Sequence, residues 1–250
     1  MRKSFAILAA GLALSALLAA PAARAAGPGL PGAWQTWEPG NDVSNIASLQ
    51  RGAGNFMGYC AGCHSIKYVR YSRMGADLQI PEDQLEALVK PGSKKNDYIT
   101  TTLTAADGEA WFGKAPPDLS LISRSKGSDY VYRFLKTYYL DDKTTNGTNN
   151  LALPGTAMPH VLSALQGAQV LKTVKKDGQD TFEAFEIVEP GQLTPEQYDE
   201  FLRDTVNFLE YAGEPVKAKR EALGVWVMLF LLVFTALAWL LKREYWRDVK

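Results

Sequence analysis

Two cysteines and a histidine stand close together in the segment Cys60-Ala61-Gly62-Cys63-His64. On a helical turn, positions i and i+3 share one face, so the two thiols can each form a thioether with one vinyl group of the same haem. His64 follows directly and can supply the proximal imidazole to the iron. C-x-x-C-H is the attachment pattern of a c-type haem, and it predicts one covalently bound haem c.

Two other kinds of site use part of this pattern. A thiol–disulfide exchange site needs a βαβ context, and the surrounding sequence indicates none. A zinc site usually needs a second Cys/His pair, whereas the chain has only two cysteines and two histidines. An exported pair of cysteines would ordinarily suggest a disulfide, but the C-x-x-C-H spacing makes haem thioethers the better use of them.

The residues alone do not determine which side chain is the sixth ligand of the iron. A methionine thioether would give a closed, electron-transferring iron of raised potential. Met158 stands after a long loop, in Ala157-Met158-Pro159-His160. Met57 belongs to the helix that leads into the motif, and Met74 follows His64 closely. His160 is a rival ligand, and an iron with an open site is the third alternative.

The N-terminus has the three parts of a secretory signal peptide, predicted over residues 1–25. Arg2 and Lys3 form the basic region, an Ala- and Leu-rich run follows, and Ala23-Arg24-Ala25 fits the cleavage rule. An uncleaved membrane helix is the alternative, but the apolar run is short and ends at a proline.

A second apolar segment predicts a membrane anchor over residues 221–242. Leu223–Leu241 contains nineteen residues without a charge, which just spans the bilayer hydrocarbon at about 1.5 Å per residue. Trp226 and Trp239 lie near its ends, where interfacial aromatic residues are expected. A helix of that length in a water-soluble domain would have a polar face, and this segment has none.

The two apolar segments together predict the topology of the chain. The signal peptide exports residues 26–220 as a periplasmic cytochrome c domain, and residues 243–250 remain as a cytoplasmic tail. Basic residues follow the anchor, as expected for a cytoplasmic end, although others precede it. The expected location is the bacterial inner membrane, crossed once.

The exported part is mildly acidic. Residues 26–221 contain 20 basic and 25 acidic side chains. This balance argues against nucleic acid as a partner and is compatible with a basic protein partner.

The pattern of apolar residues predicts a mainly helical domain. The strongest helix is 194–211, where Thr194, Pro195 and Gln197 form a capping box with proline in the first turn. Other helices are expected over 41–59, 81–89 and 128–140. Irregular structure is expected over 26–41, 100–117 and 141–157, and residues 168–190 form either a hairpin or a loop.

Four features in this order resemble the cytochrome c1 family, the haem subunits of the cytochrome bc1 complex (ubiquinol:cytochrome c oxidoreductase). They are CAGCHS at 60–65, APPDLS at 115–120, AMP at 157–159 and the apolar C-terminal anchor. The resemblance runs from about residue 34 to the C-terminus. C-x-x-C-H alone is common to many cytochromes, and PPDLS at this distance from it is much more specific.

The resemblance implies an axial pair and a fold. His64 and Met158 become the expected iron ligands. The expected fold is mainly α, a class I cytochrome c-like domain with insertions, plus one C-terminal transmembrane helix.

The resemblance also assigns residues to the haem pocket. Pro116 and Pro117 are expected along the haem edge. A basic residue shortly after PPDLS lies near a haem propionate in the family, and Arg124 and Lys126 are the matching candidates, with a solvated basic turn as the alternative. Tyr130 is expected to pack in the pocket.

The sequence departs from the family pattern in two places. Trp111-Phe112-Gly113-Lys114 precedes the prolines where many relatives have small residues and asparagine, so the edge of the pocket differs there. The disulfide of some relatives is absent, since both cysteines belong to the haem motif.

The implied function is one-electron relay within an oxidoreductase complex, with no catalytic residue in this chain. A Rieske iron–sulfur protein would reduce this haem, which would reduce a cytochrome c. Cytochrome b and a second copy of the whole complex are further expected partners. Five acidic residues between 177 and 189 would either steer a basic cytochrome c or form a solvated surface.

Three rival functions remain to be distinguished from this one. Another membrane-anchored c-type carrier would not co-purify with cytochrome b. A haem enzyme or gas sensor with an open site would have high-spin iron. A structural subunit with a vestigial motif would carry no covalent haem.

Overall fold

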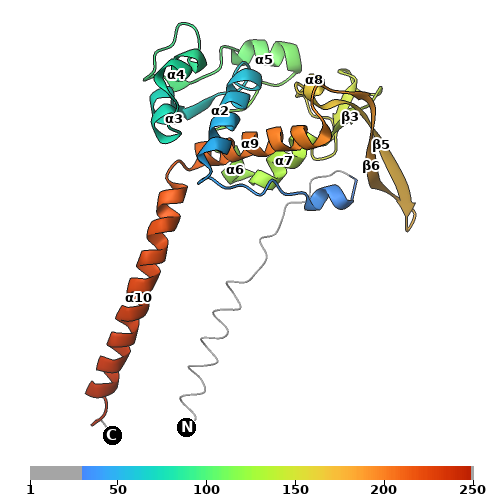
Figure 1. Ribbon diagram of the computed structural model, residues 1–250. Helices are drawn as coiled ribbons and strands as arrows, with labels where there is room; N and C mark the ends of the chain where they lie inside the picture. The colour runs from blue at the N-terminus through green and yellow to red at the C-terminus, as the bar shows by residue number, and fades with distance from the viewer. Residues whose placement is uncertain (1–29, 249–250) are drawn as a thin grey trace.

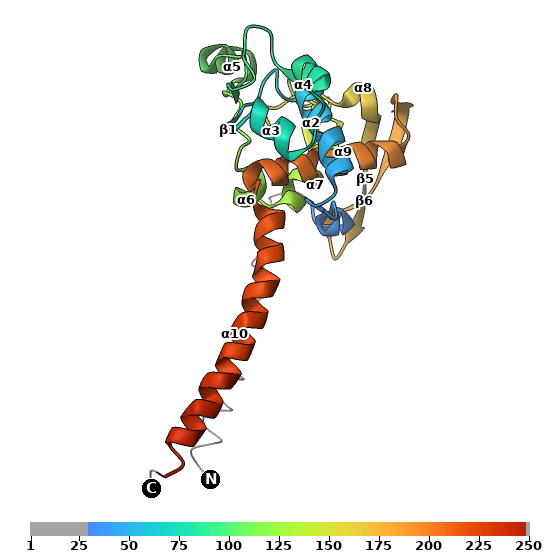
Figure 2. The same cartoon turned by 60° about the vertical axis from the view of Figure 1, so that its left-hand side comes forward.

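The computed structural model describes residues 30–248, so the predicted signal peptide at 1–25 lies outside the described residues. Helices make up most of one domain, and the long helix α10 (Lys217–Tyr245) extends away from it as a single rod (Figure 1; Figure 2). The sheets of the described part are small, each with two antiparallel strands. The architecture confirms the predicted mainly α fold with a C-terminal apolar helix.

The centre of the domain is a crossing of two helices that are far apart in the sequence, α2 (Ile46–Tyr59) and α9 (Pro195–Gly213). A Cβ atom on Gly52 would lie only 2.1 Å from the carbonyl oxygen of Asp204, so glycine is what lets the two backbones approach. Phe56 and Phe208 are fully buried beside the crossing, with ring centroids 5.7 Å apart. The crossing therefore holds the C-terminal end of α2, where the cysteine motif begins.

Local capping residues set where these two helices begin. The side chain of Asn45 accepts a hydrogen bond from the amide of Ser48, so α2 begins later than the predicted residue 41. At α9, Thr194 and Gln197 form the predicted capping box, with Pro195 in the first turn. The prediction of a helix over 194–211 is confirmed, and the helix continues for two further residues.

A segment of short elements follows the cysteine motif. It comprises β1 (Ile66–Arg70), α3 (Tyr71–Asp77), α4 (Glu82–Leu88), β2 (Tyr98–Ile99) and α5 (Ala105–Phe112). The expectation of irregular structure over 100–117 is wrong, because Thr104 caps α5 by accepting a hydrogen bond from the amide of Asp107. Gly113 ends the helix in the left-handed conformation, at φ 74°, as is common at helix C-termini.

Two helices pack against α9 from the middle of the chain, α6 (Ile122–Ser125) and α7 (Ser128–Lys136). The predicted helix 128–140 ends early, because the chain turns at Thr137 into strand β3 (Tyr138–Leu140). Ser128 does not cap α7; its hydroxyl donates to Glu210 of α9 instead.

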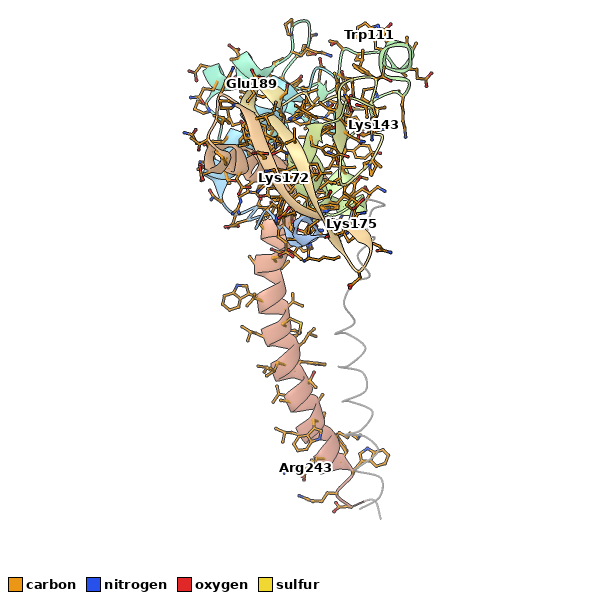
Figure 3. All side chains as sticks on the ribbon, turned by 90° about the vertical axis from the view of Figure 1, so that its right-hand side faces the viewer. Trp111, Lys143, Lys172, Lys175, Glu189 and Arg243 are labelled. Atoms are coloured by element: carbon orange, nitrogen blue, oxygen red, sulfur yellow. The ribbon has the colours of Figure 1, made fainter. Side chains whose placement is uncertain are left out.

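Three further strands complete the domain: β4 (Thr148–Asn150), β5 (Gly167–Lys176) and β6 (Gln179–Pro190). Strand β4 pairs with β3, so the predicted loop 141–157 is partly a strand. Strands β5 and β6 form a long hairpin, which decides between the two structures expected for 168–190. The hairpin projects from the domain with Lys172, Lys175 and Glu189 along it (Figure 3).

A small second core joins the hairpin to the beginning of the described chain. Trp34 in η1 (Ala33–Thr36) and Phe182 in β6 are both buried in it, together with Leu151 and Ala152. Helix α8 (Ser163–Gln166) connects the segment after Met158 to β5.

Helix α10 is the candidate membrane span within the described residues, by length and apolar composition. None of its residues is buried, which is the opposite of a core helix in a water-soluble domain. Arg243 lies near its far end, and Trp111 of α5 lies at the opposite end of the molecule (Figure 3).

Candidate haem-binding site

The cysteine motif forms one tight turn at the end of α2. The amides of Cys63 and His64 both donate to the carbonyl oxygen of Cys60, at 3.1 and 2.8 Å. The amide of Cys60 itself donates to Phe56 of the helix-crossing core, at 2.8 Å. Both thiols are free. The turn therefore places the backbones of Cys60, Cys63 and His64 next to one another.

The PPDLS segment holds the imidazole. Nδ1 of His64 donates to the carbonyl oxygen of Pro117 at 2.7 Å, because a carbonyl oxygen can only accept. The amide of Leu119 donates to the carbonyl oxygen of Ser65 at 2.7 Å, which joins the two segments beside the ring. With its proton on Nδ1, His64 keeps the Nε2 lone pair for a metal, the usual arrangement of a ligating histidine. Burial lowers the pKa of His64, against the opposing effects of Pro117 and Asp118.

Cys60 lacks the electrostatics of an exchange-active cysteine. Burial, with the nearby thiol of Cys63, raises the pKa of Cys60 to about 12, whereas exchange-active cysteines have lowered pKa values. The described residues also contain no group of three or more His, Cys, Asp or Glu side chains arranged around a metal ion. Covalent haem needs only the two thiols and one imidazole, and the residues present fit it.

Met158 is a methionine of a loop that packs on this core, whereas Met57 and Met74, which belong to the same hydrophobic cluster, lie in helices. Met158 is half-buried and packs on the same hydrophobic cluster as Cys60 and Leu119. Its backbone carbonyl accepts a hydrogen bond from the hydroxyl of Tyr138 at 3.1 Å. Met74 is fully buried within α3, and Met57 is half-buried on α2 itself.

His160 lies beside Met158 and is held face to face by an aromatic ring. Its imidazole stacks on the ring of Tyr138 with centroids 4.7 Å apart and planes 4° apart. Its Nε2 atom is buried without a hydrogen-bond partner among the described residues. Burial lowers the pKa of His160 to about 4, with Gln166 opposing that effect, so the ring is neutral at physiological pH.

The two prolines of PPDLS lie between the cysteine motif and α5. A Cβ atom on Gly108 of α5 would lie 2.7 Å from Cδ of Pro116, so α5 packs directly on this proline. Pro116 is half-buried and Pro117 is exposed, its carbonyl committed to His64. Trp111, part of the departure from the family pattern, is 68% exposed on α5.

The structure separates the two basic candidates that the sequence left equal. Arg124 donates to Glu214 at 2.5 Å, and Glu214 also accepts from Arg220 of α10 at 2.6 Å. Arg124 is therefore committed to the junction between α9 and α10. Nζ of Lys126 lies 5.9 Å from the ring centroid of Tyr130 instead.

Aromatic residues on α7 and β3 connect this lysine to the methionine. Tyr130 stacks on Phe134 with ring centroids 6.3 Å apart, and Phe134 contacts Tyr138 edge-on at 5.5 Å. Phe134 and Tyr138 are not among the residues that the sequence assigns to the site. The spacing of Tyr130 and Phe134, four apart on one helix face, is the signal that the sequence offers, and it does not extend to Tyr138 because α7 ends at Lys136.

The acidic residues between 177 and 189 lie on or next to β6, facing lysines of β5. Lys172 pairs with Glu186 at 2.9 Å, and Lys175 and Lys176 are opposite Asp180 and Gln179 in the register. A surface of mixed sign gives little long-range attraction. The arrangement favours the interpretation as a solvated surface.

Comparison with known proteins gives a consistent result. The sequence matches the model of the Cytochrome C1 family over residues 39–249. It is 47% identical to the cytochrome c1 of Allochromatium vinosum over 212 residues, 83% of this chain and 87% of the relative. The ammonia monooxygenase gamma subunit of Nitrosomonas europaea is 42% identical over 209 residues, 83% and 86% of the two chains. The cytochrome c1 of Rhodospirillum rubrum is 30% identical over 234 residues, 81% and 82% of the two chains.

Membership of this family agrees with the haem-binding residues described above. It implies a covalently bound haem c and an electron-transfer role as a subunit of the cytochrome bc1 complex, an oxidoreductase. The apolar helix α10 fits the attachment of such a subunit to a membrane. The chain belongs to the cytochrome c1 family.

Proposed function

We propose that this chain binds one haem c through thioethers from Cys60 and Cys63, with His64 and Met158 as the axial ligands of the iron. The observation that carries the proposal is the hydrogen bond from Nδ1 of His64 to Pro117, which aims a free Nε2 away from the backbone. Met158 is favoured as the sixth ligand because it lies half-buried in a loop on this cluster, whereas Met57 is on α2 itself and Met74 is fully buried within α3. When bound, the haem supplies a reversible one-electron change at its iron.

The residues of the chain hold the group and set its surroundings. Pro117 fixes the imidazole plane and raises its basicity as a ligand by accepting its N–H. The hydrophobic cluster that includes Leu119 and Tyr130 excludes water from the site. Low polarity stabilises the iron state of smaller net charge, which raises the reduction potential.

We propose Lys126 as the partner of a haem carboxylate, in preference to Arg124. Arg124 already pairs with Glu214, and exchanging that partner would break the junction with α10. The ammonium of Lys126 lies near Tyr130, which is half-buried on α7 and packs against the hydrophobic cluster of Met158. Tyr130 then fills the pocket beside the carboxylate.

We propose that a Rieske iron–sulfur protein delivers one electron to this haem and that a cytochrome c removes it. Cytochrome b and a second copy of the complex complete the assembly. The exported domain lies in the periplasm and the tail after α10 in the cytoplasm, supported by the basic residues Lys242, Arg243 and Arg247 after the span. The α5 end of the domain, with Trp111, lies at the opposite end of the molecule from Arg243 of α10 (Figure 3), so this orientation would place it in the aqueous phase.

The test is to purify the full chain from its own membranes with an affinity tag and to mix the preparation rapidly with ubiquinol. The expected result is co-purification of cytochrome b and a Rieske protein, and reduction of haem c that stops when the Rieske protein is removed. Recovery with the subunits of an ammonia monooxygenase, the name borne by the Nitrosomonas relative, would contradict the proposal. So would haem reduction that does not need a Rieske protein.

A further inference from the structure

The segment that carries Met158 has little regular structure of its own. Residues 151–162, between β4 and α8, form turns and bends. The amide of Met158 has a long hydrogen bond, 3.4 Å, to the hydroxyl of Thr156, which belongs to the same loop. Something outside the loop must therefore fix the direction of the thioether.

Tyr138 of β3 contacts this segment on both sides of Pro159. Its hydroxyl donates to the carbonyl oxygen of Met158 at 3.1 Å, and its ring stacks on the imidazole of His160 at 4.7 Å. The ring of Pro159 restricts the backbone between the two contacts. The Tyr138 side chain thus contacts the residues immediately before and after Pro159.

Tyr138 is itself fixed by groups from three other elements. It is only 1% exposed. Phe134 of α7 contacts its ring edge-on, and Nε2 of Gln169 from β5 donates to its backbone carbonyl at 2.5 Å. Asn150 of β4 is its partner in the strand register. The phenol is the donor in its contact with Met158, because a carbonyl oxygen can only accept.

We infer that Tyr138 is the positioning residue for the Met158 thioether, acting through the Met158 carbonyl and the stack with His160. The inference rests on the proposed role of Met158 as an iron ligand. His160 is accordingly a packing partner and not a competing ligand. The stack holds the imidazole, with its orphaned Nε2, nearly parallel to the phenol ring.

The contacts of Tyr138 affect how well the Met158 thioether competes with other ligands for the iron. A thioether is a neutral, soft ligand, and its occupancy depends on being held in place before it binds. Loss of one neutral hydrogen bond changes an equilibrium on the order of threefold to tenfold. We expect added imidazole to displace Met158 more readily by that factor when the Tyr138 hydroxyl is removed.

The experiment compares Tyr138→Phe with Tyr139→Phe in the full-length haem-loaded complex. Tyr139→Phe is a matched control, because it is the next residue of β3 and its half-buried ring packs on Phe185 instead. Three properties are measured: the long-wavelength ferric absorption of methionine ligation, the reduction potential, and the affinity for imidazole. The covalent haem content reports whether the variants fold.

Tyr138→Phe is expected to weaken the methionine band, lower the potential and tighten imidazole binding three- to tenfold, with Tyr139→Phe unchanged. His160→Phe, which keeps an aromatic ring for the stack, is expected to retain the band, whereas His160→Ala loses part of it. Equal behaviour of Tyr138→Phe and wild type, in a wild type that shows the band, would overturn this inference alone. A wild-type band that survives Met158→Leu would instead overturn the proposed ligation, and this inference with it.

Discussion

The two sides of the candidate haem site are built by different means. On the proximal side, Cys60, Cys63 and His64 stand in one turn closed by backbone hydrogen bonds within five residues, and the His64 imidazole donates to Pro117. On the distal side, Met158 lies within the loop 151–162 and is held by Tyr138, twenty residues earlier in the sequence. The backbone of the proximal ligand is thus set by a local turn and its imidazole is oriented by one tertiary contact, whereas the distal ligand depends on tertiary contacts alone.

The two sides of the site therefore depend to different degrees on the rest of the domain. The proximal turn forms at the end of α2 and is further held by Pro117 and by Thr101, whose hydroxyl donates to the carbonyl oxygen of Gly62 at 2.6 Å. The distal loop needs β3, β4 and α7 to be packed first. We therefore expect distal changes to loosen ligation while leaving the haem covalently attached.

The largest effect is expected from removing both attachment points. Cys60→Ser together with Cys63→Ser leaves no thiol for a thioether, since the chain has no other cysteine. All covalent haem should be lost, measured as haem staining of the chain after denaturing electrophoresis. Staining that survives the double substitution would show that these cysteines are not the attachment points.

The next largest effect is expected at the crossing of α2 and α9, next to the proximal side of the site. Gly52→Ala would place a Cβ atom 2.1 Å from the Asp204 carbonyl oxygen, an overlap with backbone that no rotamer relieves. We expect a loss of about 3 kcal/mol in the free energy of unfolding, seen as a lower thermal midpoint for loss of the haem band.

The matched control is Gly54→Ala, two residues along the same helix and open to solvent. Alanine there should be neutral or stabilise by up to about 1 kcal/mol, because it lowers the entropy cost of forming the helix. Equal midpoints for the two variants would contradict the close approach of α2 and α9.

Asn150 tests the distal side without touching Met158. Its buried side chain accepts from the amides of Ala152 and Leu153 and donates to the carbonyl oxygen of Phe134. Asn150→Ala leaves these groups unpaired, at about 1–3 kcal/mol. The methionine band should weaken while covalent haem staining stays at the wild-type level.

Asn146→Ala serves as the comparison, since Asn146 is exposed and accepts only from the amide of Thr148, at 3.3 Å. Its spectrum should match wild type. If Asn150→Ala removed covalent haem as completely as the cysteine substitutions, the two sides would not be independent.

The smallest effect is expected from the basic residues after PPDLS. A cation beside the haem favours the reduced iron, so Lys126→Gln should lower the reduction potential slightly. Arg124→Gln should leave the potential unchanged, because its partner is Glu214. Redox titration of the two variants measures this directly, and a fall only in Arg124→Gln would reverse the assignment.

The proximal half of the site could be predicted from the sequence because its information is local. The spacing in C-x-x-C-H fixes the turn, and the Thr194–Gln197 capping box fixes the beginning of α9. The nineteen uncharged residues of Leu223–Leu241 likewise predict the span of α10. In each case, the residues that determine the structure are neighbours in the chain.

The distal half could not be predicted in the same way. The spacing of Phe134 and Tyr138 fits a continuous helix face, but α7 ends at Lys136. The reason is long-range: the amide of Leu151 donates to the carbonyl oxygen of Thr137 at 3.2 Å and draws the chain into β3. Helix α5 differs, since its ends are marked locally by Thr104 and Gly113.

The most direct test of the central claim is the ferric visible spectrum of the purified complex with Met158→Leu beside wild type. Axial ligation by His64 and Met158 predicts a methionine band in wild type that disappears in Met158→Leu, with covalent haem retained and a lower reduction potential. A spectrum and potential unchanged by Met158→Leu would contradict the account. His160 or an open coordination site would then take the place of the thioether.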